Sequence, residues 1–202
     1  MPCHALETDA GTAMAFDLSV LENKGEFEVP STYKILTFEL DLKKDLPQVE
    51  LPLYYEQWNW EGDLQPLPNK WYKLIKSCFG SEFCKSKGID NEQYLLENYV
   101  ANEECFDPGS FYFITTRSDF CATGFAWYND THNKKATLHW LAVDSHHRKI
   151  GLGKFVVLSI CRKMQENGIQ TCVLKTESYR THAVALYNKL GFKVVNEETV
   201  QH

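Results

Sequence analysis

Glycines and basic residues gather in residues 138–154, where an apolar strand pattern passes through a turn into a helix pattern. Gly151 and Gly153 open the helix. Three basic side chains surround its start: Arg148, Lys149 and Lys154. The first N–H groups of a helix lack intrahelical partners, and the helix dipole adds partial positive charge there. We therefore expect this turn to bind a phosphorylated ligand, with the glycines allowing close approach of the backbone.

Three phosphate-binding patterns can be compared with this stretch. A Walker loop needs glycine five residues before the Gly-Lys pair, where this chain has Arg148. A dinucleotide fingerprint needs a third glycine at the position of Val156. The pattern that fits is R-x-x-G-x-G after an apolar strand that ends at Val143. In this respect the chain resembles the GNAT-type N-acetyltransferases.

A second motif supports the same resemblance. The helix after Gly151 keeps its apolar residues on one face and ends at Asn167 and Gly168. A short strand, 171–176, and a second helix follow. The run A-x-x-x-Y-x-x-x-G-F, residues 183–192, resembles the last helix of the family. Two motifs in the family's order are more specific than either alone.

The resemblance implies the GNAT fold over residues 50–202. This is an α/β (α+β) fold, with a mixed, mostly antiparallel twisted sheet flanked by about four helices. Strands are expected at 54–60, 111–116, 123–128 and 134–143, and helices at 69–79 and 91–99.

Residues 1–45 are expected to form an N-terminal extension with one strand, 33–40. After the last helix, residues 192–202 leave room for one strand to about Asn196, whereas the family usually has two. We expect the N-terminal strand to replace the missing one, in cis or from a partner subunit. A homodimer is therefore among the expected assemblies.

Composition narrows the class further. The net charge of −6 argues against nucleic-acid binding. No apolar run is long enough to span a bilayer, and the N-terminus lacks a signal-peptide pattern. The seven cysteines are scattered, without a C-x-x-C pair, which indicates neither a metal site nor a redox motif. These features predict a cytoplasmic protein with no membrane or nucleic-acid partner.

The resemblance implies that acetyl-CoA is the cosubstrate and lies where the strand ending at Val143 separates from strand 171–176. Its pantetheine arm would pair with the backbone of Leu141, Ala142 and Val143. The pyrophosphate would contact the turn and the helix start. That set comprises Arg148, Lys149, Ile150, Gly151, Leu152, Gly153 and Lys154. Arg180 replaces an asparagine that often contacts the cofactor in the family. Two alternatives follow: Arg180 contacts CoA phosphate, or the pantetheine end is held less firmly.

The same resemblance implies the catalytic residues. Tyr187 matches the tyrosine that protonates the departing thiolate. His139 matches a histidine that takes the amine proton, directly or through water. Glu177, at the end of the next strand, is a competing base.

The implied function is an N-acetyltransferase that moves the acetyl group of acetyl-CoA to a primary amine of a small molecule or peptide, by direct attack in a ternary complex. The alternative is a non-catalytic acyl-CoA-binding module with a regulatory or assembly role. The sequence leaves open the acceptor, the acyl chain preference, the general base and the oligomeric state.

Overall fold

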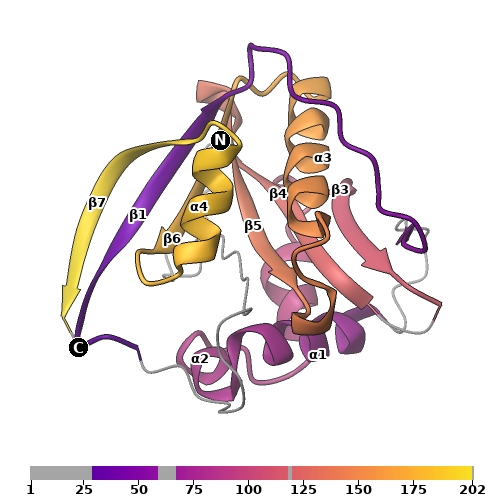
Figure 1. Cartoon of the computed structure of the whole chain (residues 1–202), viewed down its shortest axis with the longest axis vertical. Helices are drawn as coiled ribbons and strands as arrows, with labels where there is room; N and C mark the ends of the chain where they lie inside the picture. Colours follow the sequence, from indigo (N-terminus) through magenta and orange to yellow (C-terminus); the bar gives the residue numbers. More distant parts are fainter. Residues whose placement is uncertain (1–28, 59–66, 118–119, 202) are drawn as a thin grey trace.

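The computed structural model describes residues 29–58, 67–117 and 120–201. These residues form a seven-stranded sheet with the order β2-β3-β4-β5-β6-β1-β7 (Figure 1). The strands are β1 Thr32–Asp41, β2 Glu56–Trp58, β3 Phe106–Thr115, β4 Phe120–Asp130, β5 Lys135–Val143, β6 Thr171–Glu177 and β7 Lys193–Gln201. The helices are α1 Leu67–Phe79, α2 Ser81–Ser86, α3 Leu152–Glu166 and α4 Thr181–Lys189, with a π-helical turn at Leu96–Val100.

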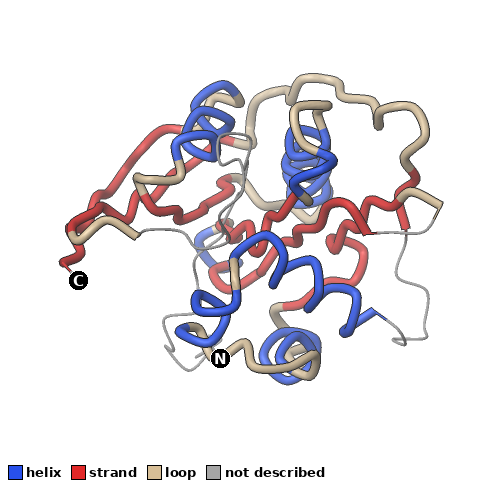
Figure 2. The backbone as a smooth tube through the Cα atoms, turned by 60° about the horizontal axis from the view of Figure 1, so that its bottom comes forward, coloured by secondary structure: helices blue, strands red, loops and turns tan. Residues whose placement is uncertain are grey.

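The sheet is open, twisted and covered on both faces (Figure 2). The α3 and α4 side holds an aliphatic core that includes Val156, Ile160 and Leu174. The α1 and α2 side holds a core rich in aromatic rings, among them Trp71 and Phe113. All neighbouring strands are antiparallel except β5 and β6, which are parallel. The mixed, mostly antiparallel sheet expected from the sequence is therefore confirmed.

The N-terminal strand lies inside the sheet, between β6 and β7 of the same chain. Phe38 of β1 is opposite Leu174 of β6 on one side and Val194 of β7 on the other. Leu36, Phe38 and Leu40 alternate along the strand and are buried in the aliphatic core. The expected strand at 33–40 is thus present, and it separates the two C-terminal strands.

Several element bounds differ from the sequence expectation. β7 extends to Gln201 rather than Asn196 because β1 supplies a pairing partner along its length. The expected helix at 91–99 is reduced to short turns that end in the π-helical turn. Within strand 54–60, only Glu56–Trp58 is paired, and residues 59–60 lie outside the described residues, as do 1–28, 61–66, 118–119 and 202.

Two features separate β5 from β6 and open the sheet. The parallel pairing covers only Lys135–Thr137 and Thr171–Val173. Farther along, β5 contains a bulge in which Trp140 has a φ of 51°. Register with β4 shifts here, because Thr123 faces Ala142 while Phe125 faces His139. The bulge places both His139 and Trp140 on the aromatic side, whereas Leu141 returns to the aliphatic side.

Removing residues 1–45 should yield insoluble protein, because β6 and β7 would both lose their shared neighbour and expose unpaired edges. The measurement is the soluble fraction after expression. A soluble, cooperatively unfolding truncation would contradict the prediction.

A milder variant is Phe38→Ala, which should lower the free energy of unfolding by about 3–5 kcal/mol in urea titrations. Thr37→Ala, on the opposite face of β1, is the matched control.

Candidate active site

A cleft of about 430 Å³ lies between β5, the turn that follows it, and α4. Eight of the residues predicted for cofactor binding line it: Leu141, Val143, Arg148, Lys149, Gly151, Leu152, Gly153 and Lys154. Seven other lining residues were not predicted: Pro47, His147, His182, Ala183, Leu186, Lys189 and Leu190. None of the described lining residues is acidic, so the cleft is suited to an anionic ligand.

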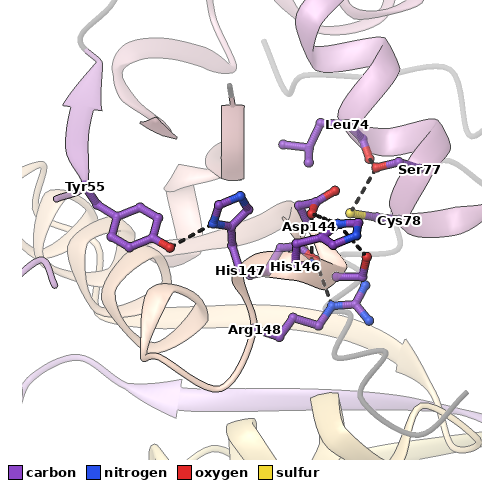
Figure 3. Close-up of polar contacts among 10 residues, drawn as sticks. Tyr55, Leu74, Ser77, Cys78, Asp144, His146, His147 and Arg148 are labelled. Carbon is purple, nitrogen blue, oxygen red and sulfur yellow. Dashed lines mark hydrogen bonds and ion pairs between the residues drawn. The ribbon is translucent and has the colours of Figure 1, made fainter. Parts of the chain in front are cut away.

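The turn before α3 is held by its own side chains (Figure 3). Arg148 is buried, and its Nε donates to the Val143 carbonyl at 3.0 Å. Asp144 accepts a hydrogen bond from the backbone N–H of His146 at 2.9 Å. Lys149 and Gly151 have positive φ values of 62° and 98°. Arg148 therefore ties the turn back to the end of β5, as well as adding charge to the cleft.

The N-terminus of α3 faces the cleft without a side-chain cap. Gly151 is the N-cap residue and makes no side-chain capping bond. The first-turn residues Leu152, Gly153 and Lys154 all line the cleft. Uncapped N–H groups and the positive end of the helix dipole together favour an anion at this place.

The β5 strand offers a free edge to the cleft. Beyond Thr137 it has no ladder pairing with β6 among the described residues. An extended ligand can pair with such an edge as an added strand would. The Leu141 and Val143 side chains line the cleft, whereas Ala142 packs in the aromatic core and can offer only backbone. Ile150 is 44% exposed and does not line the cleft.

Tyr187 lies on α4, next to the cleft-lining residues Ala183, Leu186 and Leu190. Its ring is fully buried against Phe38 and Phe192, with centroid separations of 5.6 and 5.5 Å. The hydroxyl has no hydrogen-bond partner among the described residues. Burial raises the pKa of Tyr187 well above its usual value, which keeps the phenol protonated.

His139 points away from the cleft, into the aromatic core, because of the bulge in β5. Its ring stacks on Phe125 at 5.8 Å and also contacts Tyr99 and Trp127. The side chain is 2% exposed, and burial lowers the pKa of His139 to about 3. The imidazole is therefore neutral at physiological pH, and its Nδ1 has no hydrogen-bond partner among the described residues.

Glu177 and Arg180 form a buried ion pair at the end of β6, with Arg180 Nε 2.5 Å from Glu177 Oε2. The guanidinium also lies over the rings of Phe79, Phe83 and Tyr179 at 5.3–5.4 Å. These rings place it on the side of α1 and α2, and Arg180 does not line the cleft. A contact between Arg180 and CoA phosphate stays a prediction, and the observed contacts of Arg180 are with its own chain.

Several tyrosines and tryptophans of the π-helical turn and of β4 are core residues. Tyr94, Tyr99 and Trp127 are buried together. The Tyr99 hydroxyl accepts a hydrogen bond from Trp140 Nε1 at 2.8 Å. The Tyr128 hydroxyl accepts one from Asn167 at 2.9 Å. Tyr99 thus stabilises the packing beneath α1 and the π-helical turn, whereas Tyr128 is hydrogen-bonded to the end of α3.

The cysteines do not assemble a reactive or metal-binding centre within the described chain. All six described cysteines are free and buried. Burial raises the pKa of Cys78, which lies beside Arg148, to about 12, so its thiol is a poor nucleophile. No cluster of metal-ligating side chains occurs among the described residues. No described helix is long and apolar enough to cross a membrane.

Comparison with known proteins assigns the family. The sequence model of the Acetyltransferase (GNAT) family matches residues 69–192, more than half of the chain. This protein therefore belongs to the GNAT acetyltransferase family, an acyltransferase family that uses acetyl-CoA.

Curated relatives match over shorter segments. N-acetyltransferase 8 of Homo sapiens is 35% identical over 60 residues, which cover 30% of this chain and 26% of that protein. The ribosomal protein bS18-alanine N-acetyltransferase of Escherichia coli K12 is 33% identical over 67 residues, 33% of this chain and 43% of that one. The matches thus span less than half of each relative.

Solved structures confirm the fold. A GCN5-related N-acetyltransferase from Sphaerobacter thermophilus has a TM-score of 0.65 at 17% identity, and the match covers 84% of this chain and 52% of that one. A putative GNAT-family acetyltransferase from Desulfovibrio desulfuricans has a TM-score of 0.55 at 14% identity, covering 73% and 98%. At these identities the likeness concerns the fold alone.

The buried His139 should make stability depend on pH. Its folded-state pKa of about 3 lies below the unfolded value, so protonation favours the unfolded chain. This contribution is fully present above pH 6.5 and is lost as pH falls toward 3. When the pH falls from 7.5 to 5.0, burial of His139 should lower the free energy of unfolding by about 2 kcal/mol. Urea titrations at both pH values measure this loss of stability. In the His139→Phe variant the loss should be about 2 kcal/mol smaller than in the unmodified protein, and an identical loss in both proteins would contradict the prediction.

Proposed function

We propose that this protein transfers the acetyl group of acetyl-CoA to a primary amine by direct attack in a ternary complex. The observation that carries the proposal is the joint presence, in one cleft, of a free β5 edge and the uncapped N-terminus of α3. A cosubstrate with an extended, amide-containing arm and a diphosphate needs both features. The thioester supplies the activated acetyl group.

The residues present fit such a ligand. The backbone of Leu141, Ala142 and Val143 would pair with the arm, as an added strand pairs with a sheet edge. The N–H groups at the start of α3 would hold the diphosphate, with Lys149 and Lys154 adding positive charge. A backbone N–H on β5 would polarise the thioester carbonyl as negative charge develops on its oxygen.

Tyr187 is the proposed proton donor to the departing thiolate. Burial raises the pKa of Tyr187, so the phenol carries its proton at physiological pH and is available as a donor, while the same shift makes it a weaker acid. Its hydroxyl makes no hydrogen bond to the described residues, so no partner need be broken when it donates. Tyr187 is itself fully buried and does not line the cleft, but its helix neighbours Ala183 and Leu186 do, which supports its nearness to the proposed path of the arm.

The proton of the attacking amine needs an acceptor. His139 is a weak base at a pKa of about 3, and Glu177 is already paired with Arg180. Both observations favour water as the immediate acceptor. The Nδ1 of His139 is buried in the aromatic core rather than in the cleft, so we assign it no contact with this water.

The proposed acceptor is a primary amine of a small molecule or a peptide. The net charge of −6 suits a cationic acceptor better than a nucleic acid. One relative is by name a ribosomal protein alanine N-acetyltransferase, which favours a peptide amine and a cytoplasmic location. The buried pair of Glu177 with Arg180 favours the alternative, a non-catalytic acyl-CoA-binding module, since it occupies a carboxylate that could serve as base.

An amine panel tests the function. The purified full chain is mixed with acetyl-CoA and with amines or peptides that carry free N-termini, and thiol release is measured. The expected result is release that depends on one class of amine. Tight CoA binding by calorimetry, without transfer to any amine, would instead support the module.

Tyr187→Phe should lower kcat by about 10²–10⁴-fold, the range for a lost general acid. Because the Tyr187 hydroxyl is buried without a partner among the described residues, removing it should leave the free energy of unfolding unchanged or raise it. CoA binding should not change. Steady-state kinetics, urea titration and calorimetry measure the three quantities. Unchanged turnover would remove the acid role.

A further inference from the structure

The order of the strands requires a long connection between β1 and β2, and this connection runs over the face of the sheet that α3 covers (Figure 1). β1 lies beside β6 and β7, whereas β2 is the edge strand at the other end of the sheet. The connection between them, residues 42–55, is called the strap below. It passes around the end of α3 and along its outer side (Figure 1).

Side chains of α3 bind the first half of the strap. Gln165 Nε2 donates to the carbonyls of Leu42 and Lys44, at 2.6 and 3.0 Å. One turn earlier on α3, Arg162 donates to the carbonyl of Pro47. Leu46, Val49 and Leu51 of the strap also pack against the aliphatic core. The strap is thus fixed to α3 rather than free in solvent.

The last residue of the strap reaches the phosphate-binding turn (Figure 3). The Tyr55 hydroxyl lies 2.8 Å from His147 Nδ1, and the two rings meet edge to face at 5.7 Å. His147 is the residue before Arg148, in the short helical turn Ser145–His147. Pro47 and His147 both line the cleft. The strap therefore contributes Pro47 to the lining of the cleft and contacts the turn that lines it further.

We propose that the strap is part of the cosubstrate site, with Tyr55 and Arg162 as positioning residues for the phosphate-bearing half of acetyl-CoA. This rests on the proposed function. The turn holds the non-glycine residue Lys149 at a φ of 62°, a conformation that costs energy and needs support from its surroundings. Tyr55 braces the turn through His147, and Arg162 holds Pro47 against the cleft.

The position of the strap confines its effect to one end of the ligand. The pantetheine arm is expected along β5, at Leu141 and Val143, whereas the side-chain hydrogen bonds where the strap meets the cleft are to His147 and Arg162. The diphosphate and nucleotide are expected at the turn and α3 start, which the strap contacts. Loosening the strap should therefore weaken binding of the full cosubstrate and leave a truncated donor unaffected.

The test compares acetyl-CoA with S-acetylpantetheine, which lacks the diphosphate and nucleotide. Tyr55→Phe removes one hydroxyl, and Arg162→Met removes the donor to Pro47 but keeps an apolar stem. Each should raise KM and Kd for acetyl-CoA about 2–10-fold, as expected for one lost hydrogen bond. kcat, and KM for S-acetylpantetheine, should stay unchanged. Tyr54→Phe, at a neighbouring residue that is 92% exposed, is the matched control and should change nothing.

Other outcomes would overturn the proposal. If KM rises equally for acetyl-CoA and S-acetylpantetheine, the two residues have only a general structural role. If KM and Kd for acetyl-CoA are unchanged in both variants, the strap is not part of the cosubstrate site. If the unmodified protein binds CoA but transfers to no amine, the catalytic function fails while the Kd comparison between CoA and pantetheine still decides the role of the strap. If it binds no CoA, both proposals fail.

Discussion

The early end of the parallel pairing between β5 and β6 is the constraint on which the rest of the site depends. Three residue pairs hold the two strands together, and then they separate. On its other side β6 is paired with β1 along its whole length, and β5 is paired with β4. Both outer edges are thus fixed while the inner edge of β5 is open. A cleft with a strand edge on one wall follows from this arrangement.

The charged residues that line the cleft are different from those that are buried in the packing of the fold. The cleft has basic residues such as Lys154 and Lys189 and no described acidic lining. The two buried charges outside it, Glu177 and Arg180, neutralise each other and lie against the rings of α1 and α2. Such a pair is strongly destabilising to break, so it holds β6 and α4 to the aromatic core. The basic residues that line the cleft are therefore separate from the buried ion pair.

The inserted strand β1 links the architecture to the cleft. By taking the place between β6 and β7, it supplies Phe38, whose ring packs against Tyr187. The same placement requires a long connection back to β2, and that connection lies over α3 and contacts the turn. The N-terminal segment is thus structurally inseparable from the site, although it lies far from it in sequence.

The sequence by itself predicted the parts of the site that depend on local spacing. The turn and start of α3, the helix with Tyr187 and the N-terminal strand were all found, because helix starts and strand alternation are local patterns. Pro47, His182 and Lys189 were missed, since only packing brings α4 and the strap to the cleft. His147 was missed although it directly precedes the predicted Arg148. The orientation of His139 was also undetermined, because the bulge at Trp140 breaks the two-residue alternation without a glycine to signal it. Local residue order therefore determined the phosphate-binding turn, whereas tertiary pairing alone decided which side chains surround it and which way the histidine points.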